Sequence, residues 1–328
     1  MARALKVEIE RFPIAGRFTI ARGSRTEAAV VTATITDGSA SGHGECVPYA
    51  RYGETVEGVA EAIEAMAAQL GGGLTRQDLQ SAMPAGAARN AVDCALWDLE
   101  AKLTGVPAHV AAGIDRLPPV TTAYTISLGS ASEMFEAAAK AAARPILKIK
   151  LGAPEGDPER IAAVRRAAPD STLIADANEG WTEANLEENL AACAAAGVQL
   201  IEQPVKADED AILARIDRRV PLCADESLHD RSDLERLRGR YDAINIKLDK
   251  AGGLTEALAL ADDAQKLGFT IMIGCMLGTS LAMAPALLVS PRARFVDLDG
   301  PLLLARDREP GLTFEGSLVH PASRALWG

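Results

Sequence analysis

Near the middle of the chain lies the segment Ile146-Leu147-Lys148-Ile149-Lys150-Leu151, a short apolar run that carries two lysines. Its length and its composition predict a β-strand. Residues two apart share one face of a strand, so Lys148 and Lys150 should project to the same side. Two ammonium groups aimed into one place are costly unless an anionic partner lies there. The segment therefore predicts a strand that faces negatively charged groups.

Similar runs follow one another along residues 118–300, separated by stretches with helical spacing such as residues 183–196 and 254–267. We predict eight strands, at residues 121–127, 146–150, 172–176, 198–202, 221–225, 242–247, 269–273 and 294–297. Strands that alternate with helices in this way predict a parallel sheet closed into a barrel. The expected fold is α/β, a modified TIM barrel of the type (β/α)7β that contains the active site, with seven helical stretches and no helix after the eighth strand.

Residues 1–117 have a different pattern, which predicts an α+β capping domain. Strands are expected at residues 5–9, 28–36 and 42–46, and helices at residues 54–70, 75–83 and 87–103. The tail, residues 301–328, contains several prolines and glycines and is expected to return to the capping domain.

Composition excludes several classes of partner. The formal net charge of -11 argues against a nucleic-acid surface. The five cysteines are widely spaced without a CxxC pair, and the chain starts without an apolar signal-like segment, so a reduced, cytoplasmic protein is expected. Residues 271–289 are uncharged, but glycines and Pro285 divide them into a strand, a turn and a helix, so no membrane partner is expected. The sequence leaves a homo-oligomer open.

Most of the predicted barrel strands end on a charged side chain, and in βα barrels the carboxyl ends of the strands form the active-site face. Taken alone, Asp176 or Asp225 is most simply an N-cap of the following helix. Taken together with Glu202, they come from three neighbouring strands and should converge. Three carboxylates about 4 Å apart repel by about 12 kcal/mol in total, which protons or a cation must offset. Hard oxygen ligands without His or thiolate favour Mg²⁺, and Asn178 is placed to support them.

Two lysines lie at opposite positions of the predicted barrel. Lys150 ends the second strand and Lys247 ends the sixth, so a substrate between them presents one face of a carbon to each amine. With the substrate carboxylate on Mg²⁺, one lysine can remove the α-proton and the other can return it from the far side, which inverts the carbon.

Three further residues are candidates for substrate binding. Asp297 and Asp299 share one face near the eighth strand, where they either bind an ammonium group or act as turn acids before Gly300. Arg22 lies between two strands of the capping domain, where it either pairs with a substrate carboxylate or is a solvated loop arginine.

Five motifs of the barrel carry a resemblance to a known family. They are Lys148-Ile149-Lys150, Asp176-Ala177-Asn178, Ile201-Glu202-Gln203-Pro204, Ala224-Asp225-Glu226-Ser227 and Asn245-Ile246-Lys247. The chain resembles the enolase superfamily, in its muconate-lactonizing-enzyme-like group, over essentially its whole length. Sites of that superfamily combine Lys or His bases with Mg²⁺. Asp297-Leu298-Asp299 is similar to the Asp-x-Asp signature of the dipeptide epimerases within this group.

The resemblance implies a function and a role for each site residue. It implies an isomerase that epimerises dipeptides, with Ala-Glu from murein as the expected substrate and one Mg²⁺ per subunit. Asp176, Glu202 and Asp225 would bind Mg²⁺, Lys150 and Lys247 would be the acid/base pair, and Lys148 would assist at the metal-bound carboxylate. Asp297 and Asp299 would bind the α-ammonium group, Thr125 would lie near the dipeptide, and Arg22, or as second choice Arg25, would hold the glutamate side chain.

Two alternatives stay open. An o-succinylbenzoate synthase or an N-acylamino acid racemase shares the lysines and carboxylates, but its substrate has no free ammonium group for Asp297 and Asp299. A catalytically silent metal-binding barrel would not need a base on both faces of the site, which counts against it.

Overall fold

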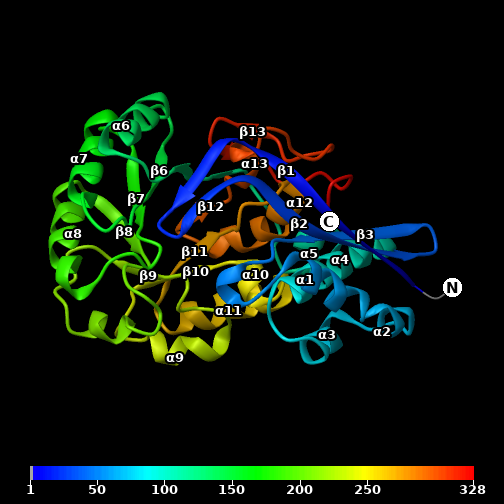
Figure 1. Cartoon of the computed structure of the whole chain (residues 1–328). Helices are drawn as coiled ribbons and strands as arrows, with labels where there is room; N and C mark the ends of the chain where they lie inside the picture. Colours follow the sequence, from blue (N-terminus) through cyan, green and yellow to red (C-terminus); the bar gives the residue numbers. More distant parts are fainter. Residues whose placement is uncertain (1–2) are drawn as a thin grey trace.

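The computed structural model describes residues 3–328. Figure 1 shows a barrel-like parallel sheet, flanked by helices, beside an antiparallel sheet with its own helices near the N-terminus. The long β1–β2 ribbon reaches from this N-terminal part across the end of the barrel. We call the N-terminal part, β1 to α5, the cap.

The described residues form an eight-stranded parallel sheet in which each strand pairs with its neighbours in the sequence. Its strands are β5 (Tyr124–Ile126), β6 (Ile146–Lys150), β7 (Thr172–Asp176), β8 (Val198–Glu202), β9 (Leu222–Ala224), β10 (Ala243–Ile246), β11 (Thr270–Gly274) and β12 (Phe295–Asp297). The sheet approaches closure where Ala123 N donates to Val296 O at 2.8 Å. The predicted α/β barrel is confirmed, and β6, β7 and β8 have the predicted bounds.

Inside the barrel, alternation along each strand produces two layers. The lower layer is apolar and contains Ala123, Ile174, Leu200, Cys223, Ala243, Met272 and Phe295. Two residues further along, β7 and β8 present Asp176 and Glu202 to the same lumen. The apolar layer therefore supports a charged layer at the carboxyl ends of the strands.

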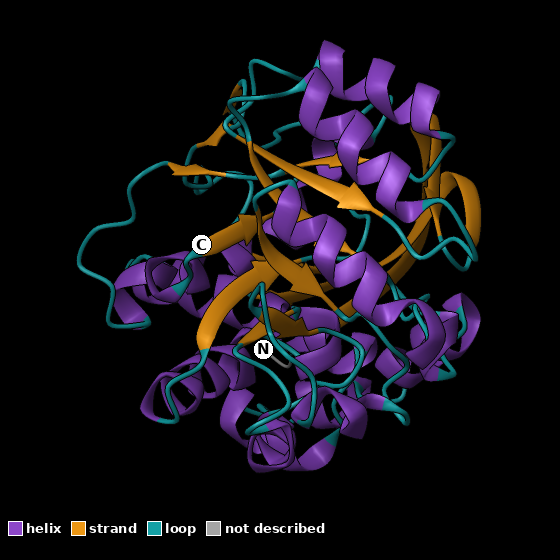
Figure 2. Cartoon of the chain, turned by 90° about the vertical axis from the view of Figure 1, so that its left-hand side faces the viewer, coloured by secondary structure: helices purple, strands orange, loops and turns teal. Residues whose placement is uncertain are grey.

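Helices surround the sheet (Figure 2). They are α6 (Ala131–Lys140), α7 (Asp157–Ala167), α8 (Glu183–Ala195), α9 (Leu234–Leu237), α10 (Leu248–Ala251), α11 (Leu254–Lys266) and α12 (Ser280–Ala286), with 3-10 turns at Asp210–Ala214, Arg231–Asp233 and Leu287–Arg292. The expectation that no helix follows the eighth strand is wrong, because α13 (Gly300–Leu303) begins directly after it. Pro301 suits this start, since proline fits the first turn of a helix.

The cap contains a three-stranded antiparallel sheet with longer strands than predicted: β1 (Ala4–Ile20), β2 (Gly23–Asp37) and β3 (Ala40–Cys46). Its helices are α1 (Val56–Glu64), α2 (Ala67–Gly71), α3 (Arg76–Ala82), α4 (Ala87–Thr104) and α5 (Ala108–Ala111), after a 3-10 turn at Ala50–Tyr52. Residues 54–70 thus form two helices instead of the single predicted one. Helix α4 lies very close to β3, since a Cβ added at Gly44 would be 2.1 Å from Ala91 O.

The tail contacts both parts of the molecule. Strands β13 (Phe314–Glu315) and β14 (Leu318–Val319) form a small sheet with β4 (Val120–Thr121). Arg308 binds Glu10 and Glu45 of the cap, each at 2.7 Å. In residues 3–328, no helix has the length and apolar character needed to cross a membrane. The stretch from 271 to 289 forms β11, a turn and α12, as predicted.

Candidate active site

Three carboxylates converge at the carboxyl ends of neighbouring strands. Asp176 and Glu202 are the last residues of β7 and β8 and pair in register, and Asp225 directly follows β9. All three are at most 2% exposed. Burial and the nearby Asp176 raise the pKa of Glu202 to about 7, with a further contribution from Asp225. The structure therefore brings the predicted metal ligands together in one buried cluster.

Three lysines neutralise this cluster. Lys148 Nζ lies 2.6 Å from Glu202 Oε2 and 3.3 Å from Asp176 Oδ2. Lys150 Nζ lies 2.6 Å from the same Asp176 oxygen, and Lys247 Nζ lies 2.6 Å from Asp225 Oδ2. Because β6 and β10 are four strands apart in an eight-stranded sheet, Lys150 and Lys247 approach the cluster from opposite sides.

The charges of the cluster control one another. Burial opposes ionisation of Asp225, but Lys247 and Lys250 outweigh it and lower the pKa of this carboxyl. Burial likewise disfavours the charged form of Lys247, yet Asp225 and Glu202 outweigh it and raise the pKa of the ammonium group. Lys247 therefore stays protonated as long as Asp225 and Glu202 have no other cation as a partner. It can become a neutral base only when another cation pairs with these two carboxylates.

The donor set fits a hard divalent cation. Oxygen ligands from three carboxylates suit Mg²⁺, which prefers oxygen over nitrogen or sulfur. Among residues 3–328, no group of three or more His, Cys, Asp or Glu side chains stands in a ready metal-binding arrangement. Within this cluster the carboxylates instead form ion pairs of 2.6 Å with Lys148, Lys150 and Lys247.

Asp297 and Asp299 form a second acidic pair beside the cluster. Asp297 Oδ2 lies 2.7 Å from Lys148 Nζ, whereas its buried Oδ1 has no hydrogen-bond partner within residues 3–328. Asp299 Oδ2 accepts a hydrogen bond of 2.7 Å from the backbone N–H of Thr125. Burial and the neighbouring Asp297 raise the pKa of Asp299 to about 7. This pair can accept hydrogen bonds from a cationic group.

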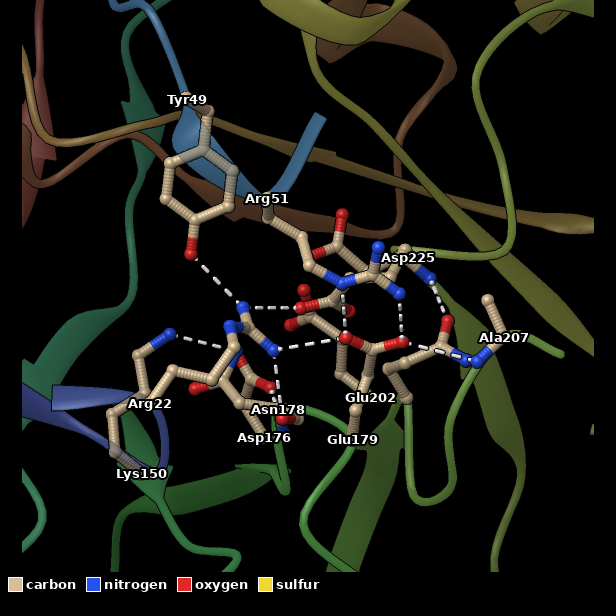
Figure 3. A network of polar contacts seen from close by, with 12 residues as sticks. Arg22, Tyr49, Arg51, Lys150, Asp176, Asn178, Glu179, Glu202, Ala207 and Asp225 are labelled. Carbon is tan, nitrogen blue, oxygen red and sulfur yellow. Dashed lines mark hydrogen bonds and ion pairs between the residues drawn. The ribbon is translucent and has the colours of Figure 1, made fainter. Parts of the chain in front are cut away.

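The cap places arginines over the strand ends. Figure 3 shows the guanidinium groups of Arg22 and Arg51 meeting at Glu179, which follows β7. Arg22 also lies 2.6 Å from Glu226 Oε1 and donates to the Asn178 carbonyl at 2.8 Å. Arg51 donates to both oxygens of Glu179 at 2.9 Å. These ion pairs join the cap to the barrel at the mouth of the site.

A cavity of about 480 Å³ lies between the cap and the strand ends. This volume is within the usual range for small-molecule sites. Lys150, Asp225 and Lys247 line it from the barrel, and arginines 22, 25 and 51 line it from the cap. Apolar walls come from residues such as Phe18 and Leu277. The cavity therefore has charged side chains on its barrel side, and apolar residues and arginines on its cap side.

Two family models match this chain and together cover most of it. Residues 2–111 match the mandelate racemase / muconate lactonizing enzyme N-terminal domain, and residues 130–315 match the enolase C-terminal domain-like family. The chain belongs to the enolase superfamily. The resemblance in its barrel motifs is thereby confirmed.

Curated relatives of this enolase-superfamily chain include two enzymes that match nearly their full length. An L-Ala-D/L-Glu epimerase from Escherichia coli is 47% identical over 325 residues, covering 97% of this chain and 99% of the relative. An N-acetyl-D-glutamate racemase from Pseudoalteromonas sp. is 44% identical over 303 residues, covering 91% and 95%.

Solved structures agree with this relationship. An enolase family member from Agrobacterium tumefaciens, with homology to dipeptide epimerases, was crystallised with sodium, L-Ala-L-Glu and an ordered loop. It is 59% identical with a TM-score of 0.98 and covers 99% of this chain and 100% of its own. A dipeptide epimerase from Cytophaga hutchinsonii, solved with Mg and D-Ala-L-Val, is 28% identical with a TM-score of 0.90, covering 98% and 94%.

The cap of this superfamily member contributes site residues that were not predicted from the sequence. Residues 22–25 lie between the predicted strands at 5–9 and 28–36, but Gly23, Ser24 and Arg25 belong to β2, which leaves a tight turn at Ala21 and Arg22. Arg51 and its partner Glu179 were not predicted as site residues. Two features of the sequence could have indicated them: Arg51 stands between two tyrosines after β3, and Glu179 lies three residues beyond Asp176.

Backbone strain also marks the loop after β7. Asn178 and Glu179 have φ of 45° and 66°, a region that residues other than glycine seldom adopt. Two hydrogen bonds of 2.9 Å support this conformation, from Asn178 N to Asp176 Oδ1 and from Glu179 N to Gln203 O. Such strain is typical of functional sites, and here it presents Glu179 to the arginines.

Proposed function

We propose that this enolase-superfamily chain is an isomerase that epimerises dipeptides, with L-Ala-D/L-Glu as the preferred substrate. The observation that carries this proposal is the position of Lys150 and Lys247 on opposite sides of one three-carboxylate cluster. A reaction that removes a proton from one face of a carbon and returns it to the other needs such a pair. The similarity to dipeptide epimerases supports the same reaction.

In the proposed mechanism, Asp176, Glu202 and Asp225 would hold one Mg²⁺ per subunit. When bound, this ion would supply stabilisation of the negative charge that develops on the substrate carboxylate as the α-proton leaves. Lys150 and Lys247 act on the α-carbon of the C-terminal residue, one as base and the other as acid. Lys148, buried between the carboxylates, donates a hydrogen bond to the substrate carboxylate.

The substrate's α-ammonium group is assigned to Asp297 and Asp299. The buried, unpartnered Oδ1 of Asp297 supports this assignment within the described chain, since a buried acceptor is costly when unsatisfied. Thr125 is assigned to the same end of the dipeptide, because its backbone N–H donates to Asp299 Oδ2 at 2.7 Å.

The glutamate side chain is assigned to Arg22, with Arg25 as second choice. Arg22 lines the cavity and is 27% exposed at its side chain, and Glu226 is the partner that a substrate carboxylate would displace. Arg25 also lines the cavity, with its guanidinium carbon 5.6 Å from the centre of the Tyr49 ring. An arginine suits a carboxylate because its planar donors match two oxygens.

A second candidate function is the racemisation of an N-acylated glutamate. The 44% identical N-acetyl-D-glutamate racemase favours it. That substrate would use the lysines, the metal site and the arginine in the same way, but it would leave Asp297 without an ammonium partner. We therefore rank it second.

Incubation in deuterium oxide with Mg²⁺ tests both candidates. We expect L-Ala-L-Glu to gain deuterium at the glutamate α-carbon and to epimerise, and N-acetyl-L-glutamate to react far more slowly. Chelation of the metal should stop both changes. The absence of exchange across a dipeptide library, read by mass spectrometry, would refute the epimerase proposal. Faster turnover of N-acetyl-L-glutamate would reverse the ranking.

We further propose that the enzyme works in the cytoplasm on peptides recycled from murein. In structural terms, we propose a division into a capping domain of residues 1–117, a barrel of residues 118–300 and a tail of residues 301–328 that returns to the cap. The contacts of Arg308 with Glu10 and Glu45 support the last assignment.

A further inference from the structure

We infer that Lys250 is a positioning residue that orients two of the proposed Mg²⁺ ligands from outside the cavity. The inference rests on the proposed metal site and goes beyond it, since it concerns a lysine that does not touch the substrate. Lys250 lies in α10, three residues after Lys247, and is 2% exposed. A buried lysine is costly, so its contacts need an explanation.

The ammonium group of Lys250 has three acceptors. It lies 2.5 Å from Asp225 Oδ1, 2.5 Å from the Asp225 carbonyl oxygen and 3.1 Å from the Asn245 carbonyl oxygen. An ammonium group has three N–H donors, so all of them are satisfied. This arrangement fixes both the backbone and the side chain of Asp225.

Lys250 and Lys247 bind different oxygens of the same carboxylate. Lys250 binds Asp225 Oδ1, and Lys247 binds Asp225 Oδ2 at 2.6 Å. Lys247 lines the cavity between the cap and the strand ends, whereas Lys250 lines only a neighbouring pocket, with Glu54 and His229. Lys247 can therefore move away and leave Asp225 Oδ2 free for a cation, while Lys250 keeps its contact with Asp225 Oδ1 on the side away from the cavity.

The same lysine acts on a second ligand through Asn245. The Asn245 side chain donates a hydrogen bond of 2.7 Å to Glu202 Oε1. Its amide is confined by Gly274, where an added Cβ would lie 2.5 Å from Asn245 Oδ1. By binding the Asn245 carbonyl, Lys250 joins the ends of β9 and β10 and helps to hold Glu202 as well as Asp225.

Removal of the Lys250 ammonium group has two opposite effects. It leaves more negative charge at the site, which favours a cation, but it also frees the Asp225 carboxylate to rotate and leaves Oδ1 buried without its donor. Groups that orient metal ligands typically contribute 10–100-fold to metal affinity. We expect orientation to dominate, because the lysine holds both the carboxylate and the backbone of Asp225.

The test compares Mg²⁺ binding by calorimetry in the unmodified protein, in Lys250→Met and in the control Lys206→Met. Lys206 is an exposed lysine paired with Glu209. We expect the Kd for Mg²⁺ to rise about 10–100-fold in Lys250→Met and to stay unchanged in the control. Saturating Mg²⁺ should restore most of kcat. Equal or tighter binding by a folded Lys250→Met protein would overturn the inference.

Two further outcomes are distinguishable. If the unmodified protein binds no Mg²⁺, the proposed function fails and the inference falls with it. If Lys250→Met does not fold, a crystal structure of the unmodified protein with Mg²⁺ decides. Lys250 should then remain on Asp225 Oδ1 while Lys247 has left Oδ2, and a Lys250 that has left Asp225 would refute the positioning role.

Discussion

The ends of the barrel strands and the cap contribute to the same cavity in different ways. Asp176 and Glu202 pair in register in the parallel sheet, Asp225 directly follows the next strand, and all three are almost fully buried. Arg22 and Arg51 lie in connections of the cap, with side chains 27% and 40% exposed. In the proposed function, the strand ends carry the chemistry, whereas the connections of the cap select the side chain of the substrate.

The energetics of the two regions differ accordingly. Breaking a buried ion pair by removing one partner typically costs about 3–5 kcal/mol, because the other charge remains buried. An exposed pair typically contributes about 0–1 kcal/mol. Substitutions at the strand ends should therefore affect every substrate strongly, and substitutions in the cap should affect substrates selectively and less.

The largest effect is expected for Lys247→Ala. Loss of a general base typically slows turnover about 10²–10⁴-fold, and we expect epimerisation of acidic and apolar dipeptides alike to slow by this factor. Because Lys150 remains, one of the two epimers should still exchange its α-proton in deuterium oxide. Mass spectrometry measures the exchange, and chromatographic separation of the two diastereomers measures the epimerisation. Unaltered rates in both directions would remove the two-base mechanism and, with it, the chemical role assigned to the strand ends.

A smaller, substrate-dependent effect is expected for Asp297→Asn. Hydrogen bonds to charged groups contribute about 1.5–3 kcal/mol, so kcat/KM for L-Ala-L-Glu should fall up to about 100-fold, mainly through KM. N-acetyl-L-glutamate, which has no ammonium group, should be affected much less. Equal losses for both substrates would show that Asp297 acts only through Lys148, its partner at 2.7 Å.

The strand ends were predictable from the sequence because each combines an apolar run with a terminal charge. Strand β7, for example, runs from Thr172 to Asp176 and places its last side chain in the lumen by simple alternation. Sheet order then brings the carboxylates together without any knowledge of loop geometry. This regularity was enough to predict which three carboxylates form the cluster.

The cap was less predictable because its functional contacts are made across the two parts of the molecule. Arg51 is held by Glu179, which lies 128 residues away, and Glu179 adopts a left-handed backbone that no local pattern indicates. The length of β1 and β2 was also underestimated, since much of β1 and the first part of β2 are exposed or half-buried and lack a continuous apolar face.

An intermediate effect is expected for Arg22→Met, which should separate acidic from apolar substrates. We expect kcat/KM for L-Ala-L-Glu to fall about 10-fold, at the lower end of a hydrogen bond to a charged group, since the side chain is partly exposed. The rate with L-Ala-L-Met should stay the same or rise. Arg25→Met is the matched comparison, and a larger loss there than in Arg22→Met would transfer the assignment to Arg25.

The smallest effect is expected for Arg51→Met. Arg51 is 40% exposed and pairs with Glu179, so its contribution should be that of a partly screened ion pair, about 0.2–1 kcal/mol. This predicts a rise in KM for L-Ala-L-Glu of at most about fivefold. Glu179 would lose Arg51 but keep its other arginine partner, Arg22. Arg219→Met, at an exposed pair with Asp217, is the control. A loss as large as that of Arg22→Met would mean that Arg51 binds the substrate carboxylate itself and that the cap recognises acidic side chains with two guanidinium groups.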